Sequence, residues 1–166
     1  MNSSVTLRKA IALTAAGFLA AGTALIAAPG ASAAKADLVW YLSSPERTVV
    51  DLPPTGPSIG DITVSNGDVT EVPGKIAVGF YTTSQVTVRV NIPGGREIRD
   101  VDLAISAPGG VIYLTSIIRA NSGTPPTKAQ TFAIIGGTGK YEGVAGQAIH
   151  SGFTAQGSKI SFFFTG

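Results

Sequence analysis

The chain has one histidine and no cysteine, so few of its residues could carry out catalysis or hold a metal. One histidine cannot form a His-based zinc cluster, and without cysteine there is no thiolate ligand or nucleophile. His150 could serve as a general base only beside a serine and an orienting group. Its nearest serine in sequence is Ser151, and no Gly-x-Ser-x-Gly elbow occurs. We therefore expect a partly exposed strand histidine and no metal site.

Acidic residues fall into two groups that could take part in acid–base or ion-pair chemistry. The first group comprises Asp61, Asp68 and Glu71, which flank one predicted hairpin. Asp61 lies in a run whose other face is apolar, so it is a pocket candidate, although an exposed position is favoured. The second group mixes Glu97, Asp100 and Asp102 with Arg96 and Arg99. Such mixed charges in neighbouring strands are typical of solvated cross-strand pairs.

A glycine-rich run at 136–140 invites comparison with a phosphate-binding loop. That loop would need glycine at position 134 and a hydroxyl residue at position 141, where the chain has Ile134 and Tyr141. The glycines are also spaced too widely for a dinucleotide-binding fingerprint. The run is therefore predicted to be a turn between two strands, and no cofactor is expected.

The first 33 residues have the three-part pattern of a secretory signal. A polar start carries Arg8 and Lys9, an apolar or small-residue stretch covers 10–28, and Ala31-Ser32-Ala33 follows. Small residues at this spacing predict cleavage after Ala33. A retained membrane anchor is the alternative, but the stretch is poor in Leu and Ile. We expect a secreted, extracellular protein with no stable membrane insertion once the signal is removed.

The charge of the chain is carried by this leader. The whole sequence has 12 Lys and Arg against 10 Asp and Glu, and Arg8 and Lys9 are the leader's only charged residues. The remainder is therefore formally neutral. Without clustered basic residues it lacks the electrostatic footprint for nucleic acid or an anionic membrane surface. An uncharged, hydrophobic small molecule is the favoured partner.

After residue 37 the sequence alternates apolar and polar residues at period two, between glycine and proline punctuation. The pattern predicts strands at 38–42, 62–65, 75–91, 101–106, 111–119, 130–135, 147–154 and 158–165. Asn66-Gly67-Asp68 predicts a tight hairpin, because these residues tolerate positive φ. Residues 76–81 are apolar at successive positions and are predicted to be covered on both faces. The loop at 121–127 is predicted to be exposed.

Eight or nine short strands indicate either a β-sandwich or a barrel. We favour an all-β, closed antiparallel eight-stranded barrel of lipocalin-like shape, because closure removes exposed strand edges. Such a barrel is either filled by side chains or able to hold one small ligand. Residues 34–58 would supply the N-terminal segment and first strand, and residues 59–166 the remainder of the single barrel domain.

One segment resembles a known family. The run FAIIGGTGKYEGVAGQ at 132–147 is similar to the Gly-Gly-Ser/Thr-Gly-x-Phe/Tyr-x-x-x-x-Gly signature shared by plant allene oxide cyclases and dirigent proteins. Residues 60–64 and 78–81 resemble the early barrel strands of both families, and 159–166 resembles the aromatic closing strand of the cyclases. The signature glycines are Gly136, Gly137, Gly139, Gly143 and Gly146.

The resemblance implies an eight-stranded barrel with an apolar central cavity, assembled as a homotrimer. It also implies candidate catalytic residues from the dirigent pocket pattern: Tyr81 matches its Gly-Phe-Tyr, Arg119 follows a run near the expected strand, and Asp61 matches loosely. Beside Tyr81, the side chains of Trp40 and Tyr113 could form aromatic walls for a ligand. The same aromatic side chains could instead fill the barrel.

Three functions remain open from the sequence. The leading one is a dirigent-like barrel that binds or orients a small hydrophobic metabolite without a cofactor, by folding it into one conformer and excluding water. The second is a cofactor-independent cyclase or isomerase resembling allene oxide cyclase. The third is a secreted structural or protein-interaction domain, although secreted inhibitors of this size usually depend on disulfides.

Overall fold

The computed structural model describes residues 34–165, and the predicted signal at 1–33 lies outside the described residues. The strands are β1 (Leu38–Leu42), β2 (Glu46–Val50), β3 (Ile62–Thr70), β4 (Gly79–Ile92), β5 (Arg96–Ala107), β6 (Gly110–Asn121), β7 (Gln130–Gly137), β8 (Ala145–His150) and β9 (Ser158–Thr165), with a 3-10 helix η1 (Gly139–Tyr141) between β7 and β8. Within residues 34–165 no helix is long and apolar enough to cross a membrane.

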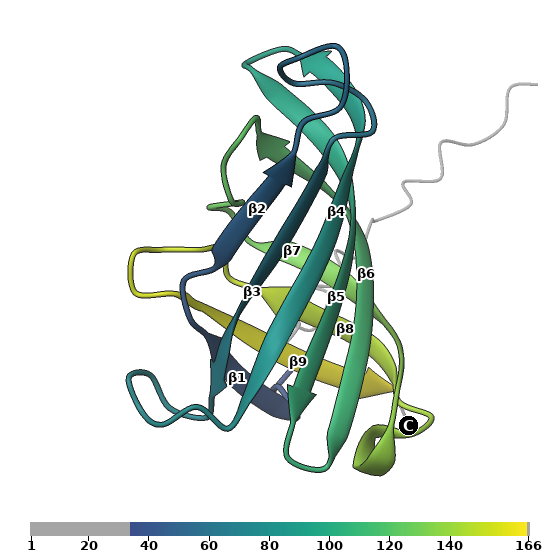
Figure 1. Ribbon diagram of the computed structural model, residues 1–166. Coiled ribbons are helices and arrows are strands. Elements are labelled where there is room, and N and C mark those ends of the chain that lie inside the picture. Colours follow the sequence, from purple (N-terminus) through teal and green to yellow (C-terminus); the bar gives the residue numbers. More distant parts are fainter. Residues whose placement is uncertain (1–33, 166) are drawn as a thin grey trace, which may run out of the picture. The chain divides into compact units, whose positions relative to one another are not determined.

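The strands pair in one antiparallel sheet with the order β1-β9-β8-β7-β6-β5-β4-β3-β2, and β1 also pairs with β3, which joins the sheet into a ring (Figure 1). Both β1 and β2 pair with β3, β1 at its end and β2 at its start. They are two halves of one strand position, interrupted at 43–45, where Pro45 has no N–H to donate. The predicted all-β antiparallel barrel is confirmed, with nine strands at eight positions.

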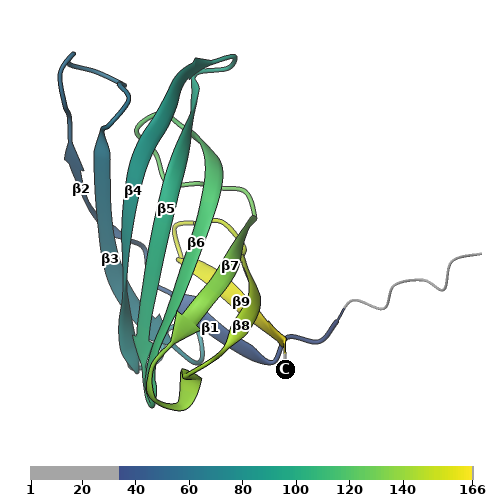
Figure 2. The same cartoon turned by 90° about the vertical axis from the view of Figure 1, so that its right-hand side faces the viewer.

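The ring is complete only in its lower half, the end that holds the β5–β6 turn in Figure 1. In the upper half β2 pairs with β3 alone. There β6 is not paired with β7, because the β6–β7 pairing covers only Ile112 to Thr115, near the β5–β6 turn. Strands β2 to β6 therefore extend beyond β1 and β7–β9 as a curved sheet (Figure 2). The barrel is open along one side of its upper half.

The predicted hairpin at 66–68 is wrong, because β3 runs straight through these residues. Gly67 lies opposite Tyr81 in the β3–β4 pairing. A Cβ atom at position 67 would lie 2.7 Å from Cε1 of Tyr81 and 2.5 Å from Oγ of Ser43. The glycine is there because the Tyr81 ring approaches the β3 backbone closely, and the chain turns later, between residues 71 and 78.

The predicted strand start at 75 and the double covering of 76–81 are also wrong. β4 begins at Gly79, and Ile76, in the connection before it, is 89% exposed. Phe80 lies on the outer face of the barrel at 59% exposure. An apolar run does not by itself distinguish a covered strand from a projecting loop.

Inward-facing residues fill the lower half of the barrel. Trp40 packs edge-on against Tyr141 and Phe162, with ring centroids 5.9 and 5.2 Å apart. Ile105 and Ile112 beside them are completely buried. Trp40, Tyr141 and Phe162 are therefore part of a closely packed core and do not form the walls of a cavity.

The glycine run forms the turn between β7 and β8 that the sequence predicts. Gly139 has a φ of 61°, in the left-handed region, and opens η1. A Cβ atom on Gly110 would lie 1.9 Å from the carbonyl oxygen of Thr138. The β5–β6 turn and this turn therefore approach each other as closely as bare backbone allows, and larger residues would push the two apart.

Candidate functional site

The interior of the upper half has one polar wall and one apolar wall. The inward residues of β3 and β4 are mostly hydroxyl or amide side chains: Thr63, Ser65, Thr83, Gln85 and Thr87. Strands β5, β6 and β7 contribute mostly apolar side chains to the same space: Val101, Leu103, Ile118 and Phe132. An interior of this kind suits a molecule with an apolar body and a hydrogen-bonding edge.

A cavity of about 30 Å³ lies between the two walls. That volume is about the space of one water molecule in the liquid. Its lining is Leu42, Tyr81, Thr83, Gln85, Val101, Leu103, Ile118, Pro126, Phe132, His150 and Phe153. We call this space the inner cavity.

Two loops, 122–129 and 151–157, close the inner cavity on the open side of the barrel. The backbone N–H of Phe153 donates to the carbonyl oxygen of Pro126 over 2.9 Å, which joins the loops. The Phe153 ring lies 4.6 Å from the His150 ring and 6.4 Å from the Tyr81 ring, measured between centroids. Pro126 and Phe153 are only partly buried. They form a lid whose displacement would enlarge the cavity.

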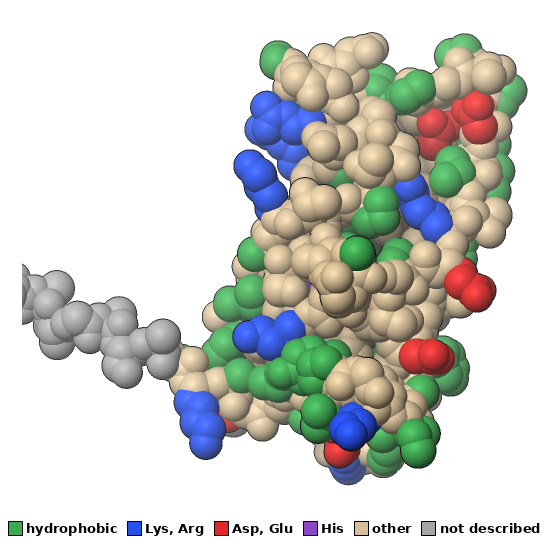
Figure 3. Space-filling model, turned by 90° about the vertical axis from the view of Figure 1, so that its left-hand side faces the viewer, with side chains coloured by type: hydrophobic (Ala, Val, Ile, Leu, Met, Phe, Trp, Pro, Cys, Tyr) green, Lys and Arg blue, Asp and Glu red, His purple; other side chains and the backbone are tan. Residues whose placement is uncertain are grey.

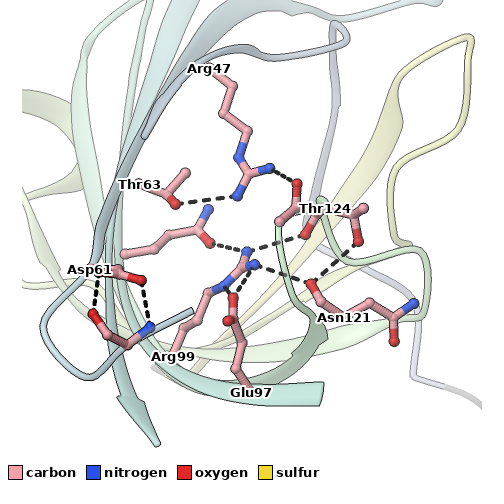
Figure 4. Close-up of polar contacts among 10 residues, drawn as sticks. Arg47, Asp61, Thr63, Glu97, Arg99, Asn121 and Thr124 are labelled. Carbon is pink, nitrogen blue, oxygen red and sulfur yellow. Dashed lines mark hydrogen bonds and ion pairs between the residues drawn. The ribbon is translucent and has the colours of Figure 1, made fainter. Parts of the chain in front are cut away.

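Above the inner cavity lies a buried polar cluster around Arg99, which is 1% exposed (Figure 4). Its Nε donates to the Glu97 carboxylate over 2.6 Å, and its Nη1 donates to the side-chain oxygen of Gln85 over 3.0 Å. The guanidinium also donates to the backbone carbonyls of Asn121 and Thr124, each over 3.2 Å. The predicted solvated pairing of Glu97 and Arg99 is therefore wrong, because both side chains point inward from β5.

Arg47 extends toward this cluster from β2. One of its nitrogens donates to Thr63 Oγ1 over 3.2 Å and the other to the carbonyl oxygen of Gly123 (Figure 4). Partial burial, and then the positive charge of Arg99, lower the pKa of the Arg47 guanidinium from its ordinary value. Arg47 borders an outer hollow of about 200 Å³ that Glu97 also lines. The Arg99 cluster thus separates that hollow from the inner cavity.

His150 is buried, at 3% exposure, so the predicted partly exposed position is wrong. Nδ1 accepts the backbone N–H of Gly152 over 3.2 Å, and Nε2 lies 2.8 Å from Oγ of Ser158. Because Nδ1 accepts, the ring proton of the neutral imidazole is on Nε2, which donates to the serine. Burial lowers the pKa of His150 to about 4, which keeps the ring neutral near pH 7. In this tautomer the histidine cannot take a proton from Ser158.

Tyr81 is completely buried and its ring lines the inner cavity. Its hydroxyl donates to the backbone carbonyl of Ser43 over 3.0 Å, at the interruption between β1 and β2. Burial, and then the charge of Asp68, raise the pKa of the phenol. The hydroxyl is therefore protonated and holds the ring in one orientation against the cavity.

Two other predicted site residues lie away from this cavity. Trp40 belongs to the packed lower half. Asp61 closes the loop before β3: its Oδ1 accepts the N–H of Leu52 over 3.0 Å, and its Oδ2 accepts the N–H of Ser58 over 2.8 Å. The Ser58 hydroxyl also donates to Oδ1, over 2.7 Å. The two bonds from Ser58, followed by the one from Leu52, lower the pKa of the Asp61 carboxyl. In the structure Asp61 orders a loop at the rim of the outer hollow.

Arg119 and Tyr113 both lie on the outer face of β6, where Tyr113 is 42% exposed. The structure therefore does not bring Tyr81, Arg119 and Asp61 together, and their catalytic roles stay predictions, as do the ligand-binding roles of Trp40 and Tyr113.

The sequence does not predict several features of this interior: the positions of Gln85, Glu97 and Arg99, the inward position of His150, and the lid. For the two β5 residues the sequence does contain an indication. Glu97 and Arg99 alternate in step with the inward-facing Val101 and Leu103, so all four side chains lie on the same face of the strand.

Charges on the face that Figure 3 shows are unevenly distributed. Basic side chains gather at its upper left, and most of the acidic side chains lie along its right-hand side. Within the described part of the chain, no three His, Asp or Glu side chains are grouped so that they could hold a metal ion. The residues present supply hydrogen bonds and apolar contacts.

Comparison with known proteins identifies similar folds. No protein-family model matches the sequence, and a search of curated proteins finds no significant match. A pyocyanin demethylase matches with a TM-score of 0.65 at 22% identity, over 77% of this chain and 98% of that one. The Diels–Alderase AbmU from Streptomyces koyangensis matches with a TM-score of 0.52 at 11% identity, over 78% of this chain and 67% of its own.

A third structure, a nonspecific haem-binding cyclase that catalyses a (4 + 2) cycloaddition during neoabyssomicin biosynthesis, matches with a TM-score of 0.50 at 13% identity, over 76% of this chain and 59% of that one. Similarity at these identities reports backbone architecture, because one barrel can host many different chemistries. The chain shares the barrel fold of these three proteins.

Proposed function

We propose that the protein binds a small, mainly apolar molecule inside the upper half of its barrel and holds it in one conformation. The observation that carries the proposal is the inner cavity, which has a hydroxyl and amide wall on one side, an apolar wall on the other and a lid of two loops. A barrel selected for stability alone would be filled with apolar side chains, because buried polar groups add little net stability.

The ligand enters by displacing the lid. The inner cavity holds about one water molecule as it stands, so a larger molecule needs the space that Phe153 and Pro126 occupy. Both residues come from loops, which have lower local stability than paired strands. Once inside, a flexible ligand would be confined between Phe132 and Tyr81, with Gln85 and Thr83 fixing its polar edge.

A fluorescence titration tests the proposal, with N-phenyl-1-naphthylamine as a neutral apolar probe. We expect saturable binding at one site per chain. Thr83→Phe, which fills the inner cavity, should abolish it, whereas Thr82→Phe adds the same ring to the outer face of the same strand and should leave it unchanged. Circular dichroism of both variants checks the fold. Equal effects of the two substitutions would rule out the interior as the binding site.

A second candidate function is a cofactor-independent cyclase or isomerase. It is supported by the fold shared with proteins named as a Diels–Alderase and as a cyclase. A barrel can accelerate a ring closure by holding its substrate in a reactive conformer. Native mass spectrometry of protein from its own culture fluid would identify a retained molecule. If Tyr81→Phe and Asp61→Asn leave turnover of that molecule unchanged, the predicted catalytic roles are lost and only binding remains.

Secretion and trimer formation belong to the same proposal. The leader pattern of residues 1–33 supports export, and the allene oxide cyclase and dirigent resemblance supports a homotrimer with a dirigent-like orienting role. Mass spectrometry of the mature N-terminus should find Ala34 as the first residue. Light scattering of the secreted protein should give three times the mass of one chain, and a monomer would remove the trimer from the proposal.

A further inference from the structure

A groove of about 470 Å³ lies where β6 separates from β7. The pairing of these strands ends at Thr115 and Ala133, so the upper part of β6 and the segment before β7 diverge. Residues 119–121 of β6 and residues 125–130 line opposite sides of the space between them. We call this space the seam groove.

All charged side chains that line the seam groove are basic. They are Arg96, Arg119 and Lys128, and no carboxylate contributes to the lining. Within residues 34–165 the one ion pair joins Arg99 to Glu97, so none of the three is neutralised by an acidic partner there. The Nε of Arg96 donates only to the backbone carbonyl of Pro93, over 3.2 Å. The net neutrality of residues 34–166 therefore conceals a local site of positive potential, where an anion would be favoured.

Pro126 connects the seam groove with the inner cavity, because it lines both spaces. Strand β6 borders both spaces: Ile118 lines the inner cavity, and Arg119, the next residue, lines the groove on the other face of the strand. Successive residues of a strand point to opposite faces and are separated by about 3.3 Å along it. A molecule passing Pro126 would thus have one end among cations and the other among apolar side chains.

We infer that the ligand of this barrel is an amphipathic organic anion, with its carboxylate or sulfonate group held by Arg96, Arg119 and Lys128 and its apolar body in the inner cavity. The inference rests on the proposed function and specifies the ligand class for that site. A guanidinium matches a carboxylate with two parallel hydrogen bonds, and Lys128 adds a third cation. Gln130, which also lines the groove, offers an amide donor to the same headgroup.

Two probes with one carbon skeleton test this assignment. 1-Anilinonaphthalene-8-sulfonate is N-phenyl-1-naphthylamine with an added sulfonate, so the comparison isolates the contribution of the negative charge. We expect the anionic probe to bind about tenfold more tightly than the neutral one, since several cations face the sulfonate. Raising the salt concentration should weaken the anionic probe alone, because it screens partly exposed charges.

Substitutions test whether the groove residues, and not other surface charges, bind the anionic probe. Arg119→Gln and Lys128→Gln should each weaken the anionic probe about threefold and leave the neutral probe unchanged. Arg89→Gln removes an exposed arginine on β4 that does not line the groove, and it should change neither affinity. In the unsubstituted protein the anionic probe should also shift the methyl signals of Ile118, which reports the apolar end.

The possible results distinguish the two claims. Equal affinities for both probes, with no effect of the groove variants, would overturn the anionic ligand and leave the apolar site intact. Binding of the anionic probe without a shift at Ile118 would place it only on the surface and would also overturn the inference. If the neutral probe does not bind at all, the proposed function itself fails.

Discussion

Glu97 and Arg99 are two residues apart on β5, and both point into the barrel above the inner cavity. A buried ion pair adds little stability over apolar residues of similar volume, but losing one partner is costly because a buried charge is left alone. The strand's alternation indicates their inward direction, since Val101, Leu103 and Ile105 follow at the same parity. The local pattern does not reveal the partners of Arg99, because Asn121, at the end of β6, and Thr124, in the loop that follows, are 22 and 25 residues away from it.

Glu97→Gln keeps the shape of the side chain and removes the charge that Arg99 faces. We expect the free energy of unfolding to fall by about 3 kcal/mol, as for other buried pairs that lose one partner. Adding Arg99→Met should restore most of the loss. Urea denaturation measures both changes. Asp100→Asn, at the exposed position directly after Arg99, should change stability by less than about 0.5 kcal/mol. An equal loss there would contradict the buried-pair account.

His150 should make stability depend on pH. Its pKa of about 4 in the folded protein is below the ordinary 6.5, so between these values the unfolded chain binds more protons. Stability attributable to His150 is therefore complete above pH 6.5 and is lost as pH falls toward 4, by about 3 kcal/mol in total. Urea denaturation at several pH values should show a smaller loss over this interval in His150→Gln. Parallel profiles for the two proteins would mean that the ring is not held neutral.

Strand β3 shows how an element can be misread from local signals. Asn66-Gly67-Asp68 is a strong turn sequence, yet the segment is a strand, since Gly67 gives room to the ring of Tyr81 on β4. That contact joins residues 14 positions apart and is invisible in a short window of sequence. By contrast, β9 begins and ends at the residues that the sequence predicts, 158 and 165.

Gly67→Ala should destabilise the fold by about 2 kcal/mol, in the range of overpacked interiors. The added Cβ would meet the Tyr81 ring and Ser43 at distances below van der Waals contact. Asn66→Ala, at the adjacent exposed position, is the matched control and should have a small effect. Chemical denaturation of both variants distinguishes this account from a turn at 66–68, in which Asn66 would matter as much as Gly67.

The lid is the element on which ligand entry depends. Phe153→Ala should enlarge the inner cavity, because it removes the ring that lies between His150 and the solvent side. We expect N-phenyl-1-naphthylamine to bind more tightly, since engineered apolar cavities take up aromatic molecules. Phe80→Ala removes the same ring from the outer face and is the control. Unchanged probe affinity in Phe153→Ala would show that the lid does not limit the site.

At the scale of the whole barrel, the sequence alone predicts the fold class and most strands, but not which half of the barrel is sealed. Alternation identifies strands whatever they pair with, whereas closure depends on β1 meeting both β9 and β3. The sealed lower half and the lidded upper half follow from that pairing. The predicted site residues Trp40 and Tyr81 consequently have different surroundings, one in packed core and the other beside the inner cavity.

Methyl-labelled nuclear magnetic resonance with N-phenyl-1-naphthylamine tests the central claim most directly. Val101, Leu103 and Ile118 line the inner cavity, whereas Ile135 and Ile149 are exposed on the outer face at 61% and 38%. Binding in the upper half of the barrel predicts saturable shifts of the three inner residues and contacts from the probe to their methyl groups. Shifts confined to Ile135 and Ile149, or no shifts at all, would contradict an interior binding site.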